Sequence, residues 1–322
     1  MRLLTAVSLC VALLGTCSIA QSLQDTRAAA ERGDAKAQRI LGALYGIGEV
    51  VPVDFAEAAR WYRKAADQGD SGAQNALGLY YSLGFGVEKD EAKALFWFRR
   101  AADGGDATAQ MQLGEIYRYG IGVPQDHTQA TRWIRKAAEQ GNAKAQDSLG
   151  VSYAGGLGVP ADFAEALRWY RKAADQGIAH AQSALAHNYE RGESLPQDYA
   201  EAARWYRRAA DQSVASAQSA LGFMYASGKG VPQDYAEAVR WFRRAADQGD
   251  HGGLIGLGES YYKGRGVAQD FVAAHMWFNL AASQGNPGSA EVRDLLAKTM
   301  TREQIAEAQR MAREWKPKSE GK

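Results

Sequence analysis

The chain has 322 residues, of which 46% are hydrophobic and 23% charged, a balance typical of a folded protein and not of a disordered one. Its 38 Lys and Arg residues against 37 Asp and Glu residues give a formal charge of +1, so no basic excess is present to attract nucleic acid or an anionic membrane surface. The two cysteines, Cys10 and Cys17, lie near the N-terminus, which excludes disulfides, zinc–thiolate sites and cysteine catalysis from the rest of the chain.

Residues 1–20 have the pattern of a signal peptide. Arg2 precedes an apolar run at residues 3–14, and small side chains up to Ala20 provide a cleavage site. We therefore expect export by the Sec route, cleavage after Ala20, and a periplasmic or secreted mature protein without a transmembrane segment. A second interpretation stays open: "LLGTC" approximates a lipobox, in which case Cys17 would carry a lipid anchor.

From residue 33 to residue 284, one pattern of 36 residues recurs seven times without a slip. The predicted repeats are 33–68, 69–104, 105–140, 141–176, 177–212, 213–248 and 249–284. Such regularity predicts one structural unit stacked on itself, because an insertion would break the contacts between neighbours. The residues that mark the period are Trp61, Trp97, Trp133, Trp169, Trp205, Trp241 and Trp277.

Each repeat is predicted to hold two helices. In the sixth repeat Asp234 can cap the second helix, with Glu237 completing a capping-box-like pair, and Gly249 ends that helix. The tryptophans lie between small alanines on the apolar face, which predicts core packing and not a ligand-binding stripe. A glycine in the middle of the first helix, such as Gly78, predicts that another helix backbone passes close by.

The repeated pattern "A-Q…L-G…Y…G-x-G-V-P-Q-D…A…W-x-R-K-A-A-x-Q-G" resembles the Sel-like (Sel-one-like, SLR) repeat, a relative of the tetratricopeptide repeat. The resemblance covers about residues 33–284. It implies an all-α fold, an α/α solenoid in the form of a right-handed superhelix, whose concave surface holds partner proteins. Family members act as adaptors, in secretory-pathway quality control and at bacterial envelopes. The implied function is a non-catalytic scaffold, adaptor or regulator in the bacterial envelope, with an envelope sensor or a cell-wall enzyme as partner.

Both ends of the solenoid are predicted to be capped. Residues 21–32 form an N-terminal half-repeat, because "RAAAERGD" echoes the end of the first repeat. Residues 285–316 form C-terminal capping helices, with Thr301 and Gln304 as a capping box. Residues 317–322 are predicted to be a flexible tail.

Several motifs suggest chemistry but lack the partners that the chemistry needs. Ser260 and Lys263 match S-x-x-K of penicillin-recognising enzymes, and no S-D-N or K-T-G accompanies them. Weak β-lactam or peptidoglycan hydrolysis, suggested for some relatives, is the alternative function. The repeated G-x-G lacks a strand and a G-K-[ST], and the five histidines are scattered. We expect no catalytic residue, no cofactor, no metal and no nucleic-acid partner.

A pair of basic residues recurs near the end of the second helix in six of the seven repeats, as at Arg63 and Lys64. Stacking of the repeats would align these pairs along one ridge. Acidic residues such as Glu57 and Asp67 lie three or four positions away, so local ion pairing and solvation are the expected explanation.

Recognition is expected where the repeats differ, on variable positions of the first helix, although neutral drift would also produce such variation. The fifth repeat departs most from the others, with Ser194 in place of a glycine and with Ser213 in place of the capping glycine that follows its second helix. Its polar segment around His187 and Tyr189 is the expected centre of the site. The residues predicted to bind a partner mix aromatic and charged side chains. They are Glu115, Arg118, Tyr119, His187, Glu190, Arg191, Phe223, Glu259, Tyr262 and Lys263.

Overall fold

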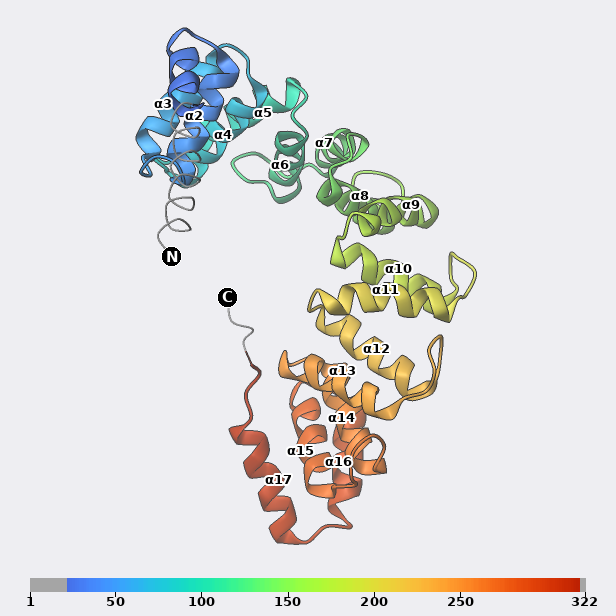
Figure 1. Ribbon diagram of the computed structural model, residues 1–322. Helices are drawn as coiled ribbons and strands as arrows, with labels where there is room; N and C mark the ends of the chain where they lie inside the picture. Colours follow the sequence, from blue (N-terminus) through green and yellow to red (C-terminus); the bar gives the residue numbers. More distant parts are fainter. Residues whose placement is uncertain (1–21, 319–322) are drawn as a thin grey trace, which may run out of the picture. The chain divides into compact units, whose positions relative to one another are not determined.

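The computed structural model describes residues 22–318, and every regular element in that range is helical (Figure 1). The predicted signal peptide, residues 1–20, lies outside the described residues. The chain divides into two compact units, unit 1 up to Asp162 and unit 2 from Phe163. In unit 1, residues 22–31 are helical and are followed by α2 (Ala35–Ile47), α3 (Phe55–Asp67), α4 (Ser71–Leu83), α5 (Glu91–Asp103), α6 (Ala107–Tyr119), α7 (His127–Glu139) and α8 (Ala143–Gly155). Unit 2 holds α9 (Phe163–Asp175), α10 (Ala179–Arg191), α11 (Tyr199–Asp211), α12 (Ala215–Ser227), α13 (Tyr235–Asp247), α14 (His251–Lys263), α15 (Phe271–Ser283), α16 (Pro287–Ala297) and α17 (Arg302–Glu314).

Seven pairs of helices, from α2 to α15, form the repeats. The even-numbered helix is the first helix of a repeat and the odd-numbered helix is the second, so α12 and α13 make up the sixth repeat. Within each unit, each of these helices packs against the helices before and after it in the chain. This confirms the predicted all-helical, solenoid-like stacking of helix-turn-helix units. Over residues 22–318 no helix combines the length and the hydrophobicity that a membrane crossing requires.

Most first helices begin at a capping side chain and end at a glycine. In α2, Asp34 accepts a hydrogen bond from the Ala37 N–H at 2.7 Å, and Gly48 ends the helix with a left-handed φ of +80°. The exceptions are α10 and α12, which follow Ile178 and Val214 and have no side-chain cap. Because a missing cap typically costs about 1 kcal/mol, these two helices depend more on their packing.

The second helix is capped on one side only, which corrects the predicted capping-box-like pair. Asp234 accepts a hydrogen bond from the Glu237 N–H at 2.9 Å. The Asp234 N–H donates to the Tyr225 carbonyl at 3.0 Å, so it is not available to the Glu237 carboxylate. That carboxylate instead accepts from the Trp241 indole at 2.9 Å and pairs with Arg240 at 3.2 Å. The bond from the capping Asp to a tyrosine nine residues earlier recurs in all seven repeats.

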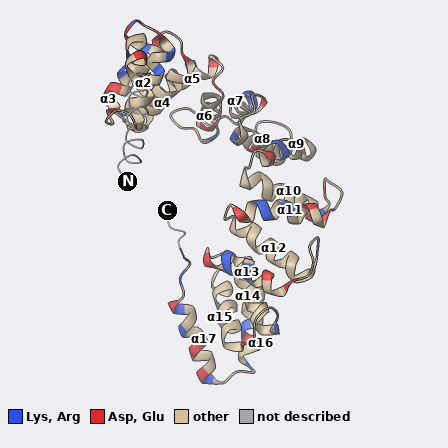
Figure 2. Cartoon of the chain, viewed as in Figure 1, with Lys and Arg blue, Asp and Glu red and all other residues tan. Residues whose placement is uncertain are grey.

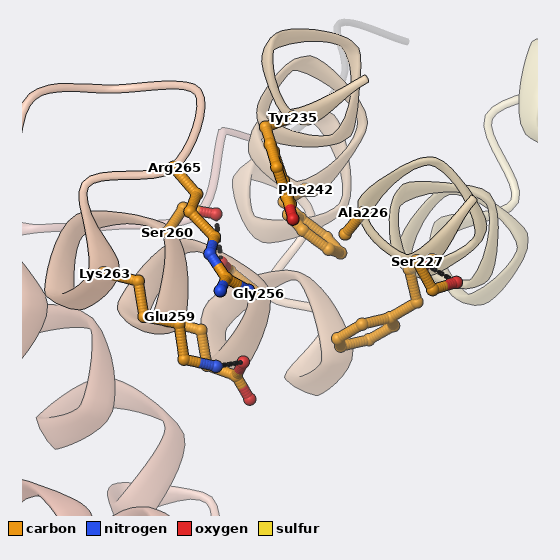
Figure 3. Close-up of a pocket in the computed structure, with 10 residues that line it drawn as sticks. Ala226, Ser227, Tyr235, Phe242, Gly256, Glu259, Ser260, Lys263 and Arg265 are labelled. Atoms are coloured by element: carbon orange, nitrogen blue, oxygen red, sulfur yellow. Dashed lines mark hydrogen bonds and ion pairs between the residues drawn. The ribbon is translucent and has the colours of Figure 1, made fainter. Parts of the chain in front are cut away.

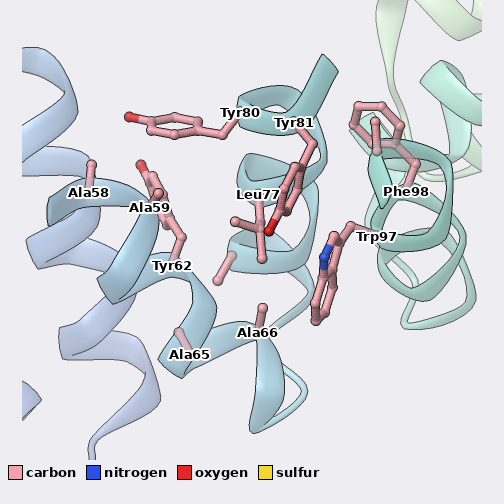
Figure 4. Packing of buried hydrophobic residues seen from close by; sticks show 12 residues of the cluster. Ala58, Ala59, Tyr62, Ala65, Ala66, Leu77, Tyr80, Tyr81, Trp97 and Phe98 are labelled. Carbon is pink, nitrogen blue, oxygen red and sulfur yellow. The ribbon is translucent and has the colours of Figure 1, made fainter. Parts of the chain in front are cut away.

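The hydrophobic core fills the space between the helices of successive repeats. Figure 4 shows it around α4, where Leu77 lies among aromatic side chains from α3, α4 and α5. Leu77 is 1% exposed, and the rings of Tyr62 and Tyr80 meet edge to face with centroids 5.3 Å apart. Five of the seven periodic tryptophans are buried and two, Trp133 and Trp277, are half-buried. The predicted core role of the tryptophans is confirmed.

In most repeats the glycine in the middle of the first helix faces a ring and not the helix backbone that the sequence suggested; at Gly114 the backbone is close, since an added Cβ would lie 3.1 Å from the Ala130 carbonyl oxygen. A Cβ added at Gly78 would lie 2.7 Å from the Phe98 ring, and one at Gly222 would lie 2.6 Å from the Phe242 ring. Both rings come from the second helix of the same repeat. The glycine therefore gives the aromatic side chain of the second helix a place to pack.

In the first six repeats an arginine of the second helix reaches the first helix of the next repeat, and Arg27 of the N-terminal half-repeat reaches the first repeat in the same way. Arg63 donates to the Tyr81 hydroxyl at 2.6 Å, and the ammonium of Lys64 lies 3.9 Å from the centroid of the indole three residues before it. The acid expected to pair with them, Glu57, pairs with Arg60 instead. The arginine–tyrosine pairs, each 18 residues apart, are Arg27–Tyr45, Arg63–Tyr81, Arg99–Tyr117, Arg135–Tyr153, Arg171–Tyr189, Arg207–Tyr225 and Arg243–Tyr261.

Buried glutamines form a second link between repeats. Gln218, which is 3% exposed, donates from Nε2 to the Ala210 carbonyl at 3.1 Å and so satisfies an acceptor at the end of the preceding helix. Its Oε1 accepts from Gln248, thirty residues later, at 2.9 Å. The glutamine-to-carbonyl bond recurs in the first six repeats, at Gln38, Gln74, Gln110, Gln146, Gln182 and Gln218.

The last repeat is covered by α16 and α17. Thr301 and Gln304 form the predicted capping box at the start of α17. Trp315 meets Trp277 edge to face, with ring centroids 5.8 Å apart. Lys318, assigned to a flexible tail from the sequence, donates from its backbone N–H and from Nζ to Asp247 at 2.7 and 3.0 Å. Residues 319–322 lie outside the described range.

Candidate functional site

Three helices enclose a groove between successive repeats: the first and second helices of one repeat, and the first helix of the next. We call this an inter-repeat groove and name it by its two repeats. The constant leucines, such as Leu221 at 0% exposure, lie in the core, and the constant arginines and glutamines form the links described above. The grooves are lined largely by positions at which the repeats differ.

The 6–7 groove, between α12, α13 and α14, holds a cavity of about 220 Å³ (Figure 3). It brings together three of the residues predicted to bind a partner, Phe223, Glu259 and Lys263. Small side chains keep it open, since Ala226 lines one wall and Gly256 another.

Aromatic rings form the apolar part of the 6–7 groove. Phe223 and Phe242 meet edge to face, with ring centroids 4.8 Å apart. A Cβ at Gly256 would lie 2.4 Å from the Phe242 ring, so the bare backbone of α14 lets this ring sit between two first helices. In Figure 3 Phe242 lies beside Ala226. The result is an apolar surface that an incoming side chain can reach.

The rim of the 6–7 groove carries charge. Lys263 and Glu259 form an ion pair at 2.7 Å across one turn of α14. Arg265 lies with its guanidinium carbon 5.3 Å from the centroid of the Tyr235 ring. Within residues 22–318 no carboxylate lies within ion-pair distance of Arg265. This guanidinium is exposed and available to an anion.

The S-x-x-K motif lies in the same groove but lacks the geometry of a nucleophile and its base. The Ser260 hydroxyl is buried and donates to the Gly256 carbonyl at 2.7 Å. The Lys263 ammonium is engaged with Glu259 at 2.7 Å. A catalytic serine needs a base within hydrogen-bond reach of its hydroxyl, and this hydroxyl is held by its own helix.

The 2–3 groove, between α4, α5 and α6, repeats this arrangement with different chemistry. It also holds a cavity of about 220 Å³. Phe98 stands where the 6–7 groove has Phe242, and the predicted residue Glu115 stands where it has Glu259. The remaining lining is more apolar, with Ile116 in place of Ser260 and Ile121 in place of Arg265.

The 1–2 groove is filled by an aromatic cluster. The Tyr80 side chain occupies the position of Ser260, and its ring meets those of Phe55 and Phe85 with centroids 6.2 and 6.1 Å away. Phe55 and Phe85 stack at 4.9 Å. Burial, reinforced by Tyr80, raises the pKa of the neighbouring Tyr62 to about 12. Because these rings pack on one another, little space is left for a partner.

Two predicted site residues bridge grooves instead of facing a partner. Arg118 spans the 3–4 groove, donating to the Ser148 carbonyl at 3.2 Å and to the Ser152 hydroxyl at 3.0 Å. Glu190 crosses the 5–6 groove and accepts from the Tyr206 hydroxyl at 2.8 Å. Burial and the Glu190 carboxylate raise the pKa of Tyr206 well above its usual range, so this hydroxyl remains a donor.

The other predicted residues lie on the surface beside the grooves. Tyr119 is 67% exposed, and His187 is exposed. Arg191 pairs with Glu193 at 3.3 Å in its own loop. Tyr262 is 40% exposed and contacts the ring of Phe271. Tyr189, near the expected centre of the site, belongs to the constant arginine–tyrosine pairs.

The divergence of the fifth repeat changes a loop. In the sixth repeat the equivalent residue of Ser194 is Gly230, where a Cβ would lie 2.0 Å from the Tyr199 carbonyl oxygen. Ser194 has a Cβ, so its loop cannot approach the start of α9 as closely. A cavity of about 610 Å³ lies there, lined in part by Ala164 and Leu195.

Sequence reasoning missed Tyr235 and Arg265, which line the 6–7 groove. Attention to variable positions on the first helix overlooked the residue between the two loop glycines. That residue is apolar in repeats 2 and 3, as Phe85 and Ile121, and becomes acidic in repeat 5, as Glu193, and basic in repeats 6 and 7. Comparing the loops in register would have revealed it. Nowhere in the described part of the chain do three His, Cys, Asp or Glu side chains gather as a metal site requires.

Comparison with known proteins identifies the family to which the chain belongs. The model of the Sel1 repeat matches residues 35–70, 71–106, 107–142, 143–178, 179–214, 215–250 and 253–286. A protective antigen of uropathogenic Escherichia coli, c5321, which displays an SLR fold, is 35% identical over 91% of this chain and 71% of its own, with a TM-score of 0.65. A Sel1 repeat protein from Oxalobacter formigenes is 37% identical over 87% of this chain and 81% of its own, with a TM-score of 0.62. Among curated proteins none matches. The chain belongs to the Sel1 repeat family.

Proposed function

We propose that the protein is a non-catalytic adaptor that binds a partner protein along the surface formed by its first helices and their loops. One observation carries the proposal. The 2–3 and 6–7 grooves each hold an open cavity of about 220 Å³, and the two cavities are lined by equivalent positions of the repeat that carry different side chains. A scaffold whose constant residues are used in internal contacts, and whose variable residues line open grooves, is suited to recognition.

The N-terminal sequence supports a place outside the cytoplasm for this adaptor. We propose a periplasmic or secreted protein whose partner is an envelope protein, such as a sensor ectodomain or a wall-remodelling enzyme. The mass of the mature protein from native cells tests export. Cleavage after Ala20 is expected, and retention of Arg2 would contradict it.

Site-specific photo-crosslinking in the native host tests the binding surface. A photo-crosslinking amino acid is placed at Tyr119 in unit 1 or at Phe223 in unit 2. Matched controls carry it on second helices, at Arg60 or Arg204, whose side chains are 75% and 74% exposed. We expect the same partner band from at least one groove position and from neither control. Crosslinks from the controls alone, or from no position, would refute the proposal.

A further inference from the structure

Two cations of unit 2 occupy the same position in successive loops. Lys229 follows α12 and has its ammonium 5.1 Å from the centroid of the Tyr199 ring; Arg265 follows α14 and lies 5.3 Å from the Tyr235 ring. Over residues 22–318 neither has a carboxylate at ion-pair distance. The neighbouring charges differ in this respect, since Lys263 is paired with Glu259. The exposed edge of repeats 6 and 7 therefore carries two uncompensated positive charges.

The ring under each cation is itself held in place. Gln233 donates to the Tyr235 hydroxyl at 3.0 Å, and Gln197 does the same for the Tyr199 hydroxyl at 3.0 Å. A cation over a fixed ring retains its exposed face for an anion. In unit 1 the corresponding pair is apolar, because Phe85 stacks on Phe55. The fifth repeat has the acidic Glu193 at this position, so the positive charge is a property of repeats 6 and 7 and not of the repeat as such.

The cavity of the 6–7 groove lies beside Arg265. Its apolar lining comes from Phe223, Ala226 and Phe242. Apolar cavities of about 150 Å³ bind benzene, so one of about 220 Å³ is large enough for a single aromatic or branched side chain.

We infer that unit 2 binds an extended acidic peptide segment, with an apolar side chain in the 6–7 groove and carboxylates on Lys229 and Arg265. The spacing supports this. Helices α12 and α14 pack directly, and packed helices lie about 10 Å apart. Lys229 and Arg265 follow these helices at equivalent positions, and an extended segment in the polyproline II conformation brings residues three positions apart to the same side, about 9 Å from each other. The segment therefore carries two acids three positions apart with an apolar residue between them. This inference rests on the proposed function and names the chemistry of the partner.

Fluorescence anisotropy with defined peptides tests the inference on the purified protein at physiological salt. The probe is fluorescein-Gly-Glu-Gly-Phe-Glu-Gly, and two comparison peptides replace both glutamates by lysine or the phenylalanine by alanine. We expect the probe to bind at least about tenfold more tightly than the lysine peptide. Arg265→Gln and Lys229→Gln should each weaken the probe up to about fivefold, the range of an exposed ion pair. Arg240→Gln, which removes a 77% exposed arginine from α13, should leave binding unchanged.

A groove-filling variant tests the apolar contact. Ser260→Tyr combined with Ala226→Gly copies the 1–2 groove, where Gly46 leaves room for the Tyr80 hydroxyl, and should make the phenylalanine and alanine peptides bind equally. Ala226→Leu does the same from the opposite wall if the first variant fails to fold. Any one of three results would overturn the inference. These are equal binding of the acidic and lysine peptides, an Arg240→Gln effect as large as that of Arg265→Gln, and no change in peptide binding when the 6–7 groove is filled. If the peptide inference is overturned but position 223 still crosslinks to a partner in cells, the proposed adaptor function is retained. If no crosslink forms in cells, the adaptor function is refuted as well.

Discussion

Ser213 is the one non-glycine residue with a positive φ in the described chain, and replacing it should stabilise the protein. Its φ is +64°, whereas the corresponding Gly177 and Gly249 have φ of +93° and +78°. A left-handed conformation costs an L-residue about 1–2 kcal/mol, and glycine loses about 0.4–1 kcal/mol more backbone entropy on folding. The balance predicts that Ser213→Gly raises the free energy of unfolding by about 1 kcal/mol. The Ser213 N–H bond to the Ala210 carbonyl is kept in the variant.

Equilibrium urea unfolding followed by far-UV circular dichroism measures this change. The reverse substitution, Gly177→Ser, is the matched control in the same unit. A Cβ there would meet no atom within 4 Å, so the expected loss of about 1 kcal/mol comes from backbone conformation alone. If Ser213→Gly lowers the unfolding midpoint, or if Gly177→Ser leaves it unchanged, the assignment of strain to the left-handed residue is incorrect.

Three further substitutions examine the core and the last repeat. Trp241→Ala should lower the free energy of unfolding in urea by about 3–5 kcal/mol, because the Trp241 indole is 3% exposed. Trp133→Ala should lower it by less, because the Trp133 side chain is only half-buried, and equal losses would contradict the burial argument. Burial, reinforced by Arg293, lowers the pKa of His275, so the folded state resists protonation while the unfolded chain accepts a proton. The free energy of unfolding should therefore fall as the pH drops below about 6.5, by at most about 1.4 kcal/mol per pH unit. His275→Gln should reduce this pH dependence in unfolding midpoints measured from pH 5 to 8, and an unchanged dependence would rule His275 out as its source.

The repeat architecture could be predicted because the period is visible in the sequence. Tryptophans 36 residues apart with no slip leave little alternative to identical units, and the capping aspartates mark where the helices begin. The details that escaped prediction involve backbone bonds. The sequence suggested that Glu237 would complete a capping box, but the Asp234 N–H is already bonded to the Tyr225 carbonyl. No pattern of side chains in the sequence predicts this backbone hydrogen bond.

The openness of a groove was harder to predict than its position. Arg118 and Glu190 vary between repeats as recognition residues do, yet each bridges its own groove because a suitable partner, Ser152 or Tyr206, happens to face it. Whether a variable side chain is available depends on residues from two other helices. Sequence variation at one position of the repeat therefore identifies the binding surface. It does not identify which side chains on that surface are free to contact a partner.

The reach of the links between repeats has a consequence for how proteins of this kind change in length. The arginine–tyrosine pairs join residues 18 apart and the glutamine pairs join residues 30 apart, both less than one period. If residues 179–214 were deleted as a block, Arg171 would face Tyr225 in place of Tyr189, and Gln218 would replace Gln182 as the donor to the Ala174 carbonyl, so the chemistry of the joint would be preserved. Duplication of such a block would also leave the links between repeats unchanged. Gene-level gain or loss of whole modules can therefore reset the number of docking positions without any compensating mutation.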